Sequence, residues 1–197
     1  MYFTEEDVVV LMIVKNEEEN IINTLKSFLP KIKRYCILDT GSNDNTVELL
    51  NDFFDKNNLN EGKVFIEDYS HLKYKDYELM RNKCFSLARE HFNSSKYLIW
   101  ADADWYINNI EALYNNLEKL YKNKDIYSIH QILVKHGINE HYKSNIVLTN
   151  SNVVYLRPIH EYLINGEIGE SISEDIFFEW KDTKKSSNTR KKRLVED

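Results

Sequence analysis

Glycine, proline and cysteine are scarce in this sequence. Its 197 residues include five glycines, two prolines and two cysteines. The glycine-rich loops of dinucleotide and triphosphate enzymes read G-x-G-x-x-G or G-x-x-x-x-G-K-[ST], and neither pattern occurs. Two cysteines, Cys36 and Cys84, are too few for a disulfide framework, and we expect both to be ordinary core thiols. The scarcity excludes a disulfide-stapled small protein and the common glycine-loop nucleotide enzymes.

Long apolar runs and an excess of positive charge are also missing. The longest apolar run, Val8 to Val14, is far shorter than the roughly 18 residues that a membrane-spanning helix needs. Residues 5–7 are acidic where a signal peptide would be basic. The net charge of −6 argues against a protein that coats nucleic acid. We therefore expect a cytoplasmic protein with no transmembrane segment and no nucleic-acid partner.

Aromatic residues are plentiful, and basic residues gather near the end of the chain. Aromatic residues make up 13% of the sequence, which indicates a packed core. Between Lys181 and Arg193 there are seven basic residues and one acidic residue. We expect a folded domain over residues 1–180 and a basic tail or helix over residues 181–197. A solvated terminus and a contact with an anionic membrane or polyanion are both open for this tail.

Strand-like and helix-like patterns alternate over the first part of the chain. Continuous apolar runs, which are typical of buried parallel strands, occur at residues 8–14, 35–39, 64–66 and 97–101. Apolar residues at helical spacing follow at 17–29, 46–54, 77–92 and 110–120, and Asn16 is the expected cap of the first helix. After Tyr127 come strand-like pieces without long helices. This order predicts an α/β fold with a mainly parallel, Rossmann-like sheet flanked by helices and small antiparallel additions in the C-terminal part.

Polar and acidic turns follow three of the predicted strands. They read KNEEEN after the first strand, DTGSND after the second and DADW after the fourth. Ligands of parallel α/β sheets bind beyond the carboxyl ends of the strands, so we expect these turns to line one crevice. Asp102 and Asp104 stand together at the end of a buried strand, where two carboxylates can bind one Mg²⁺ or Mn²⁺. The same pair could instead serve only to cap the next helix.

Five motifs in order resemble those of a known family. They are IVKNEEENI, ILDTGSNDNT, the Arg81-Asn82 pair, YLIWADADW and the RPIHEYL segment from Arg157 to Leu163. Their order and spacing resemble glycosyltransferase family 2, whose members have the GT-A fold, over roughly residues 8–165. The resemblance implies a hexosyltransferase-type enzyme that moves a sugar from a nucleoside-diphosphate sugar, with UDP as the expected nucleotide, to a hydroxyl acceptor. It also implies dependence on a metal and an inverting reaction.

The resemblance implies a role for each matching residue. Asp39 would accept a hydrogen bond from the nucleotide base, although it could instead only cap the next helix. Arg81 would neutralise the diphosphate, although it could instead be an ordinary arginine on a helix surface. The residues expected to contact the nucleotide sugar are Asn16, Glu17, Asp39, Thr40, Gly41, Arg81, Asp102 and Ala103.

The resemblance also implies a metal site and a base. Asp104 and Asp102 would bind Mn²⁺ or Mg²⁺, and His160 is a third candidate ligand, although a lone histidine is more often structural. Glu161 is the candidate catalytic base for the incoming hydroxyl, unless it only pairs with an arginine to brace its loop. Trp105 could stack on a sugar face, whereas Trp100 is expected to pack within the sheet.

Two departures and two alternatives accompany the resemblance. Many relatives carry an acidic residue where this chain has Trp105, and they usually continue past the His-Glu segment, so the chain could be one domain of a longer protein. One alternative is a non-catalytic nucleotide-sugar-binding or interaction module with the same fold. The other is a sugar nucleotidyltransferase, although residues 17–19 are glutamates where such an enzyme has a glycine-rich basic loop. The sugar, the acceptor and homo-oligomer formation stay open.

Overall fold

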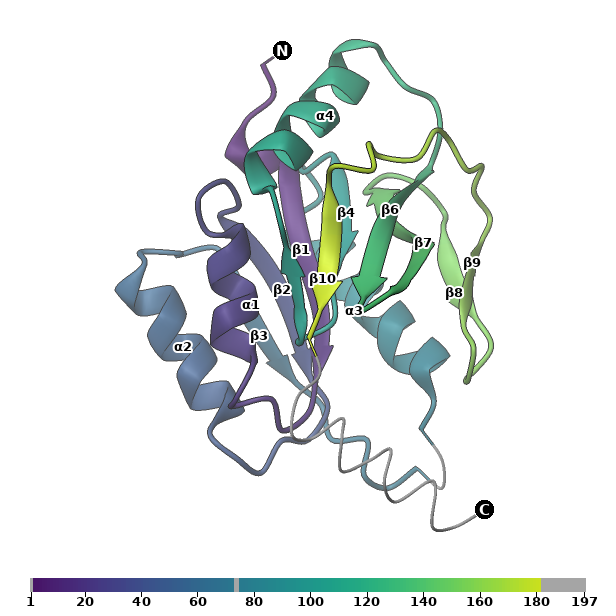
Figure 1. Ribbon diagram of the computed structural model, residues 1–197. Coiled ribbons are helices and arrows are strands. Elements are labelled where there is room, and N and C mark those ends of the chain that lie inside the picture. The colour runs from purple at the N-terminus through teal and green to yellow at the C-terminus, as the bar shows by residue number, and fades with distance from the viewer. Residues whose placement is uncertain (1, 73–74, 182–197) are drawn as a thin grey trace.

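The computed structural model describes residues 2–72 and 75–181. Its centre is an eight-stranded sheet with the order β3-β2-β1-β4-β7-β6-β10-β5 (Figure 1). The strands along that order are Gly62–Ile66, Arg34–Asp39, Val8–Val14, Tyr97–Trp100, Asn139–Leu148, Ile129–His136, Phe177–Trp180 and Trp105–Ile107. The first four run parallel; β7 is antiparallel to β4 and β6, β10 is parallel to β6, and β5 is antiparallel to β10. The predicted α/β fold with a mainly parallel sheet is confirmed.

Strand β1 is central because its two faces are both apolar. Val8, Val10 and Met12 belong to one buried cluster, and Val9 and Leu11 belong to another on the opposite side of the sheet. All five side chains are 0% exposed. A β-branched run without polar alternation therefore produces a strand covered on both faces, as parallel sheets require.

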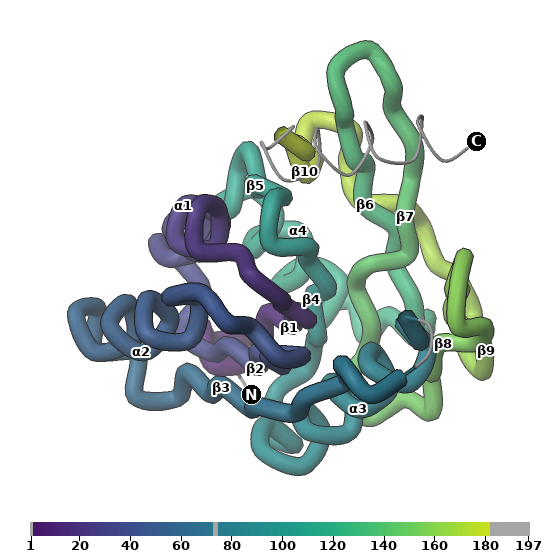
Figure 2. Tube along the Cα trace, turned by 90° about the horizontal axis from the view of Figure 1, so that it is seen from below, coloured from purple at the N-terminus to yellow at the C-terminus, as the bar shows by residue number. Residues whose placement is uncertain are grey.

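Helices cover both faces of the sheet. The helices are Ile21–Phe28 (α1), Thr46–Lys56 (α2), Tyr77–His91 (α3) and Ile110–Lys122 (α4), and a 3₁₀ turn, Glu5–Asp7 (η1), precedes β1. Apolar side chains of α1, α2 and α4 join the cluster on one face, whereas those of α3 join the cluster on the other. Figure 2 shows α1 and α2 on one side of the parallel strands and α3 on the opposite side.

The C-terminal additions are larger than expected. β6 and β7 form a long antiparallel hairpin that extends the main sheet, while Val154–Leu156 (β8) and Tyr162–Ile164 (β9) form a separate two-stranded sheet. β5 and β10 were not expected from the sequence pattern. They pair with each other, and Trp180 of β10 lies opposite Trp105 of β5. This pairing brings the end of the described chain back to the acidic turn after β4.

The start of the first helix differs from the prediction. α1 begins at Ile21, with Asn20 in the N-cap position, so Asn16 lies too far upstream to cap it. Asn16 adopts a left-handed φ of +55°, and the backbone N–H groups of Glu17 and Glu18 donate to the side chains of Thr46, the first residue of α2, and Asp44, which precedes α2. Contacts with the start of α2 therefore hold residues 16–18 outside the helix.

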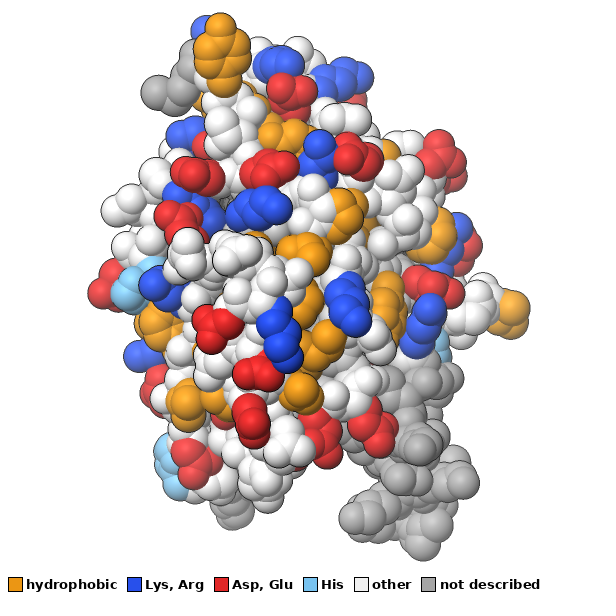
Figure 3. Space-filling view, turned by 90° about the vertical axis from the view of Figure 1, so that its left-hand side faces the viewer, with side chains coloured by type: hydrophobic (Ala, Val, Ile, Leu, Met, Phe, Trp, Pro, Cys, Tyr) orange, Lys and Arg blue, Asp and Glu red, His pale blue; other side chains and the backbone are white. Residues whose placement is uncertain are grey.

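The described surface carries both signs of charge. Figure 3 shows basic and acidic side chains interspersed over the face formed by α1 and α2. Within residues 2–72 and 75–181, no helix is both long and apolar enough to cross a membrane. The expected basic tail lies outside the described residues, apart from Lys181.

Candidate active site

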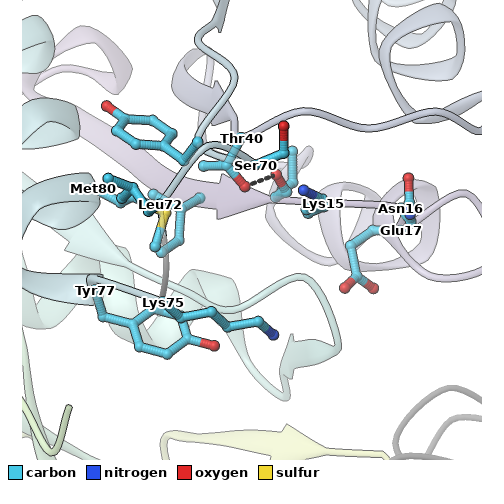
Figure 4. A pocket seen from close by; sticks show the side chains of 12 residues that line it. Lys15, Asn16, Glu17, Thr40, Ser70, Leu72, Lys75, Tyr77 and Met80 are labelled. Atoms are coloured by element: carbon cyan, nitrogen blue, oxygen red, sulfur yellow. Dashed lines mark hydrogen bonds between the residues drawn. The ribbon is translucent and has the colours of Figure 1, made fainter. Parts of the chain in front are cut away.

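A cavity of about 540 Å³ opens at the carboxyl ends of β1 and β2. Its walls come from the end of β1 and the residues after it, from Thr40 after β2, and from a stretch between β3 and α3 that includes Tyr69 and Lys75. Figure 4 shows Lys15, Glu17, Thr40 and Lys75 around this space. Of the three turns expected to line one crevice, those after β1 and β2 contribute to this cavity, whereas no residue of the turn after β4 lines it.

Asp39 holds the turn after β2 and keeps one buried oxygen unused. Its Oδ1 accepts hydrogen bonds from the N–H groups of Gly41 at 3.0 Å and Ser42 at 2.9 Å. Its Oδ2 is buried and has no hydrogen-bond partner among the described residues. Gly41 has a φ of +102°, and an added Cβ would lie 2.6 Å from Oδ1 of Asp68. The turn therefore requires glycine, and Oδ2 of Asp39 is a buried acceptor without a partner in the described part of the chain.

Short polar contacts fasten the turn after β1 to the turn after β2. The N–H of Asn16 donates to Ser42 Oγ at 2.8 Å, and Asn16 Oδ1 accepts from the N–H of Asn43 at 2.8 Å. The hydroxyl of Thr40 donates to the carbonyl of Val14 at 2.9 Å. Asn16, Thr40 and Glu17 thus reach the cavity wall from one rigid unit.

The acid pair follows β4. Asp102 Oδ1 accepts a hydrogen bond from the indole N–H of Trp100 at 3.3 Å, and Asp104 Oδ2 accepts one from the indole N–H of Trp180 at 2.9 Å. Ala103, between them, is buried, and its carbonyl accepts from the hydroxyl of Thr24 on α1. The turn is therefore fixed on several sides.

Negative charge is concentrated at Asp104. Burial, with Asp102 and Glu17 nearby, raises the pKa of Asp104 to about 6, and the hydrogen bond from Trp180 opposes this shift. A carboxylate in such surroundings gains from a nearby cation. Within residues 2–72 and 75–181, no three His, Cys, Asp or Glu side chains are placed to hold one ion. The structure therefore does not assemble His160 with Asp102 and Asp104 into a three-ligand site.

Arg81 connects the acid pair to the RPIHEYL segment. Its Nη2 is 3.5 Å from Asp102 Oδ1, and its Nε forms an ion pair with Glu161 Oε1 at 2.8 Å that lacks hydrogen-bond alignment. The guanidinium lies over the rings of Trp100 and Tyr155, with 4.3 and 5.1 Å to the centroids. Burial alone would lower the pKa of Arg81, but Asp102, Tyr155 and Glu161 together raise it above its ordinary value. Arg81 is thus a buried cation between two carboxylates.

The turn between β8 and β9 carries the remaining candidates. Arg157 and His160 both have left-handed backbones, with φ values of 78° and 56°, and His160 is exposed. Arg157 lies over the ring of Tyr162 at 5.4 Å. Of this turn, only Glu161 reaches the Arg81 and Asp102 group.

Sequence reasoning misplaced one tryptophan and missed another. Trp105 was expected at a sugar face, but it is 3% exposed and packs against Phe178, because β5 inserts it beneath β10. Trp100 is buried in the sheet as expected and also binds Asp102. Trp180 was not singled out, because its partner Asp104 is 76 residues earlier in the chain.

Comparisons with known proteins identify the family and agree with the fold. The sequence model described as Glycosyl transferase family 2 matches residues 9–177. No curated relative matches the chain in sequence. Among solved structures, Staphylococcus aureus TarS 1-349 has a TM-score of 0.63 at 13% identity, over 88% of this chain and 60% of that chain. The mannosyltransferase PcManGT from Pyrobaculum calidifontis, in complex with GDP-Man and Mn²⁺, has a TM-score of 0.51 at 16% identity. That match covers 66% of this chain and 36% of PcManGT.

The match covers most of the chain, although the chain itself spans only 60% of TarS 1-349 and 36% of PcManGT. The structural neighbours share the arrangement of a mainly parallel sheet flanked by helices, which is the GT-A fold. The chain belongs to glycosyltransferase family 2.

Proposed function

We propose that the chain transfers a sugar from a nucleoside-diphosphate sugar to a hydroxyl acceptor, with a divalent metal and with inversion at the sugar carbon. UDP is the nucleotide we expect. The observation that carries the proposal is the placement of polar groups at the carboxyl ends of parallel strands: the unsatisfied Asp39 oxygen at the end of β2, the Asp102 and Asp104 pair after β4, and Arg81, whose Nη2 is 3.5 Å from Asp102 Oδ1. The solved complex of PcManGT with GDP-Man and Mn²⁺ supports the use of a nucleotide sugar and a metal. Because the nucleotide in that complex is GDP, it does not favour UDP for this chain.

Asp102 and Asp104 fit a divalent cation. They offer carboxylate oxygens on one short turn, and burial together with the neighbouring Asp102 raises the pKa of Asp104, so a cation beside it would be favourable. With only these two carboxylates in place, the diphosphate and water would complete the coordination. The bound ion would offset the charge on the departing nucleoside diphosphate.

The rest of the crevice suits the other parts of the donor. Asp39 Oδ2 would accept an N–H of the base, and the tied turns that carry Asn16 and Thr40 would hold the nucleoside without rearrangement. Arg81 lies 3.5 Å from Asp102, so it would be near a diphosphate bound beside the acid pair. Its positive charge would then help hold the leaving group.

Glu161 is the proposed base for the acceptor hydroxyl. Its side chain is 18% exposed and belongs to a turn that is separate from the nucleotide cavity. The ion pair with Arg81 holds its carboxylate in the crevice. The same ion pair also suits a bracing role, which is why a non-catalytic module remains the second candidate.

Release of nucleoside diphosphate tests the proposal. The purified chain would be incubated with UDP-sugars and GDP-sugars, with and without Mn²⁺, and the free diphosphate measured. We expect slow hydrolysis of one donor that needs Mn²⁺ and disappears in Asp104→Asn. Binding of the donor without release would identify a non-catalytic module, and absence of binding to every donor would overturn the proposal.

A further inference from the structure

Each carboxylate of the acid pair is held by a tryptophan indole, but the two indoles come from different places. Trp100 is two residues before Asp102 and lies 3.3 Å from its Oδ1. Trp180 is at the end of β10 and lies 2.9 Å from Asp104 Oδ2. The local partner makes the longer contact, and the distant partner makes the shorter one. The position of Asp104 therefore depends on a strand that follows the family's acidic motif by about 75 residues.

The Trp180 side chain is fixed by contacts on several sides. Its backbone is paired with Trp105 of β5, and β10 also pairs with β6 as far as Lys135. The ring of His136, the last residue of β6, stacks on the indole with 4.2 Å between centroids and 25° between planes. The indole is thus aimed at Asp104 by two neighbouring strands.

The backbone repeats the same connection. The N–H of Lys181 donates to the carbonyl of Asp104 at 3.3 Å. Side chain and main chain of Asp104 are therefore both joined to the end of β10. The other carboxylate oxygen, Oδ1, receives no hydrogen bond from another residue in the described part of the chain.

We propose that Trp180 is a positioning residue that orients the Asp104 carboxylate so that its second oxygen faces the metal. The inference rests on the proposed function, because it takes Asp104 as a ligand. An indole N–H can only donate, so it fixes Oδ2 without competing for the ion. Hydrogen-bond partners of metal ligands contribute typically 10- to 100-fold to metal affinity. His136 supports the indole by stacking on it.

Replacing Trp180 by phenylalanine tests the proposal. Trp180→Phe keeps a ring for the stack on His136 and removes the N–H. Mn²⁺ affinity would be measured by electron paramagnetic resonance in the presence of UDP or GDP, with thermal stability measured in parallel. We expect the Mn²⁺ dissociation constant to rise roughly 10- to 100-fold, while nucleotide binding without metal is unchanged.

Trp105→Phe is the matched control. Trp105 is opposite Trp180 in the β5 and β10 pair and is buried, but its indole makes no hydrogen bond to a described carboxylate. This variant should lose packing and retain Mn²⁺ affinity. Equal loss in both variants would overturn the positioning role, as would wild-type affinity in Trp180→Phe.

Two further preparations make the test decisive. If Trp180→Phe does not fold, benzothienylalanine at position 180 replaces only the N–H by sulfur and should give the same loss of Mn²⁺ affinity. Asp104→Asn separates the two proposals. If it loses Mn²⁺ while Trp180→Phe does not, the positioning role fails and the proposed function stands; if the wild type binds no Mn²⁺ with either nucleotide, both fail.

Discussion

The two halves of the proposed site are held together by different contacts. The proposed nucleoside half consists of residues 14–46, where uncharged side chains and carboxylate oxygens mainly bind backbone groups of the neighbouring turn. The proposed catalytic half joins α3, the turn after β4, the turn between β8 and β9, and the end of β10. Its contacts are between charged groups and tryptophan rings. The first half is held by contacts between two neighbouring turns, whereas the second half is held by contacts between segments far apart in the sequence.

This difference has an energetic consequence. Losing one hydrogen bond to a backbone group costs roughly 1 to 3 kcal/mol when its neutral partner is left buried and unsatisfied. A buried ion group behaves otherwise, because removing one partner leaves the other charge uncompensated. We therefore expect the catalytic half to respond to substitution with large effects and the nucleoside half with smaller ones.

The largest effect on stability is expected when the central cation is removed. Arg81→Met should leave Asp102 and Glu161 without their counter-charge and lower the free energy of unfolding by about 3 to 5 kcal/mol. Urea denaturation measures this. Arg89→Met is the matched control on α3, since Arg89 binds the neutral carbonyls of Thr149 and Val153 and lies over the ring of Phe85, and its loss should cost about 1 to 2 kcal/mol. Equal losses would contradict the difference between the two halves.

The next effect concerns turnover. Glu161→Gln keeps the shape of the side chain but cannot accept the acceptor proton, so turnover should fall by roughly 100-fold or more while donor affinity is nearly unchanged. Steady-state kinetics and calorimetry on one preparation measure both quantities. A less stable protein with normal turnover per folded molecule would show that Glu161 only braces Arg81.

The nucleoside half is expected to respond more weakly. Asp39→Asn can keep Oδ1 as acceptor for Gly41 and Ser42 but replaces the unused oxygen by a donor. Calorimetry should show UDP binding weakened by about 1 to 3 kcal/mol, with unchanged affinity for pyrophosphate. If both ligands were weakened equally, Asp39 would act on something other than the base.

The sequence predicted the nucleoside half better than the catalytic half, for physical reasons. The alternation of apolar runs and amphipathic helices is a local signal, and it placed Asp39 and the acid pair at strand ends correctly. The tie between Asp104 and Trp180 depends on how β10 returns to pair with β5, which no local pattern encodes. Asn16 failed as a cap because its neighbours bind side chains 26 to 29 residues away.

The helix α3 illustrates both outcomes. Its apolar spacing gave its limits to within one residue, and Arg81 lies on it as expected. The sequence did not show that Asn82 would bind both the N–H and the carbonyl of Tyr155, at 2.8 and 2.9 Å. This contact fixes β8 against α3 and so sets where Glu161 lies.

A pH-dependent gain in stability is expected on removing the charge of Asp104. The pKa of Asp104 is about 6 in the folded chain and 3.8 as the ordinary value. As the pH rises above about 4, the unfolded chain loses this proton first, which favours unfolding until the folded chain also ionises near pH 6. Asp104→Asn cannot ionise, so in the presence of a chelator its melting temperature should exceed that of the wild type at pH 7 and equal it near pH 4. Calorimetric scans across this range measure the difference, with Asp52→Asn on the exposed side of α2 as a control that should change little.

Adding Mn²⁺ and UDP at pH 7 should then stabilise the wild type alone, because a ligand raises the melting temperature only of a chain that binds it. A gain in stability of the same size at pH 4 and pH 7 would mean that the charge of Asp104 is already compensated, and the contrast between the two halves of the proposed site would lose its basis.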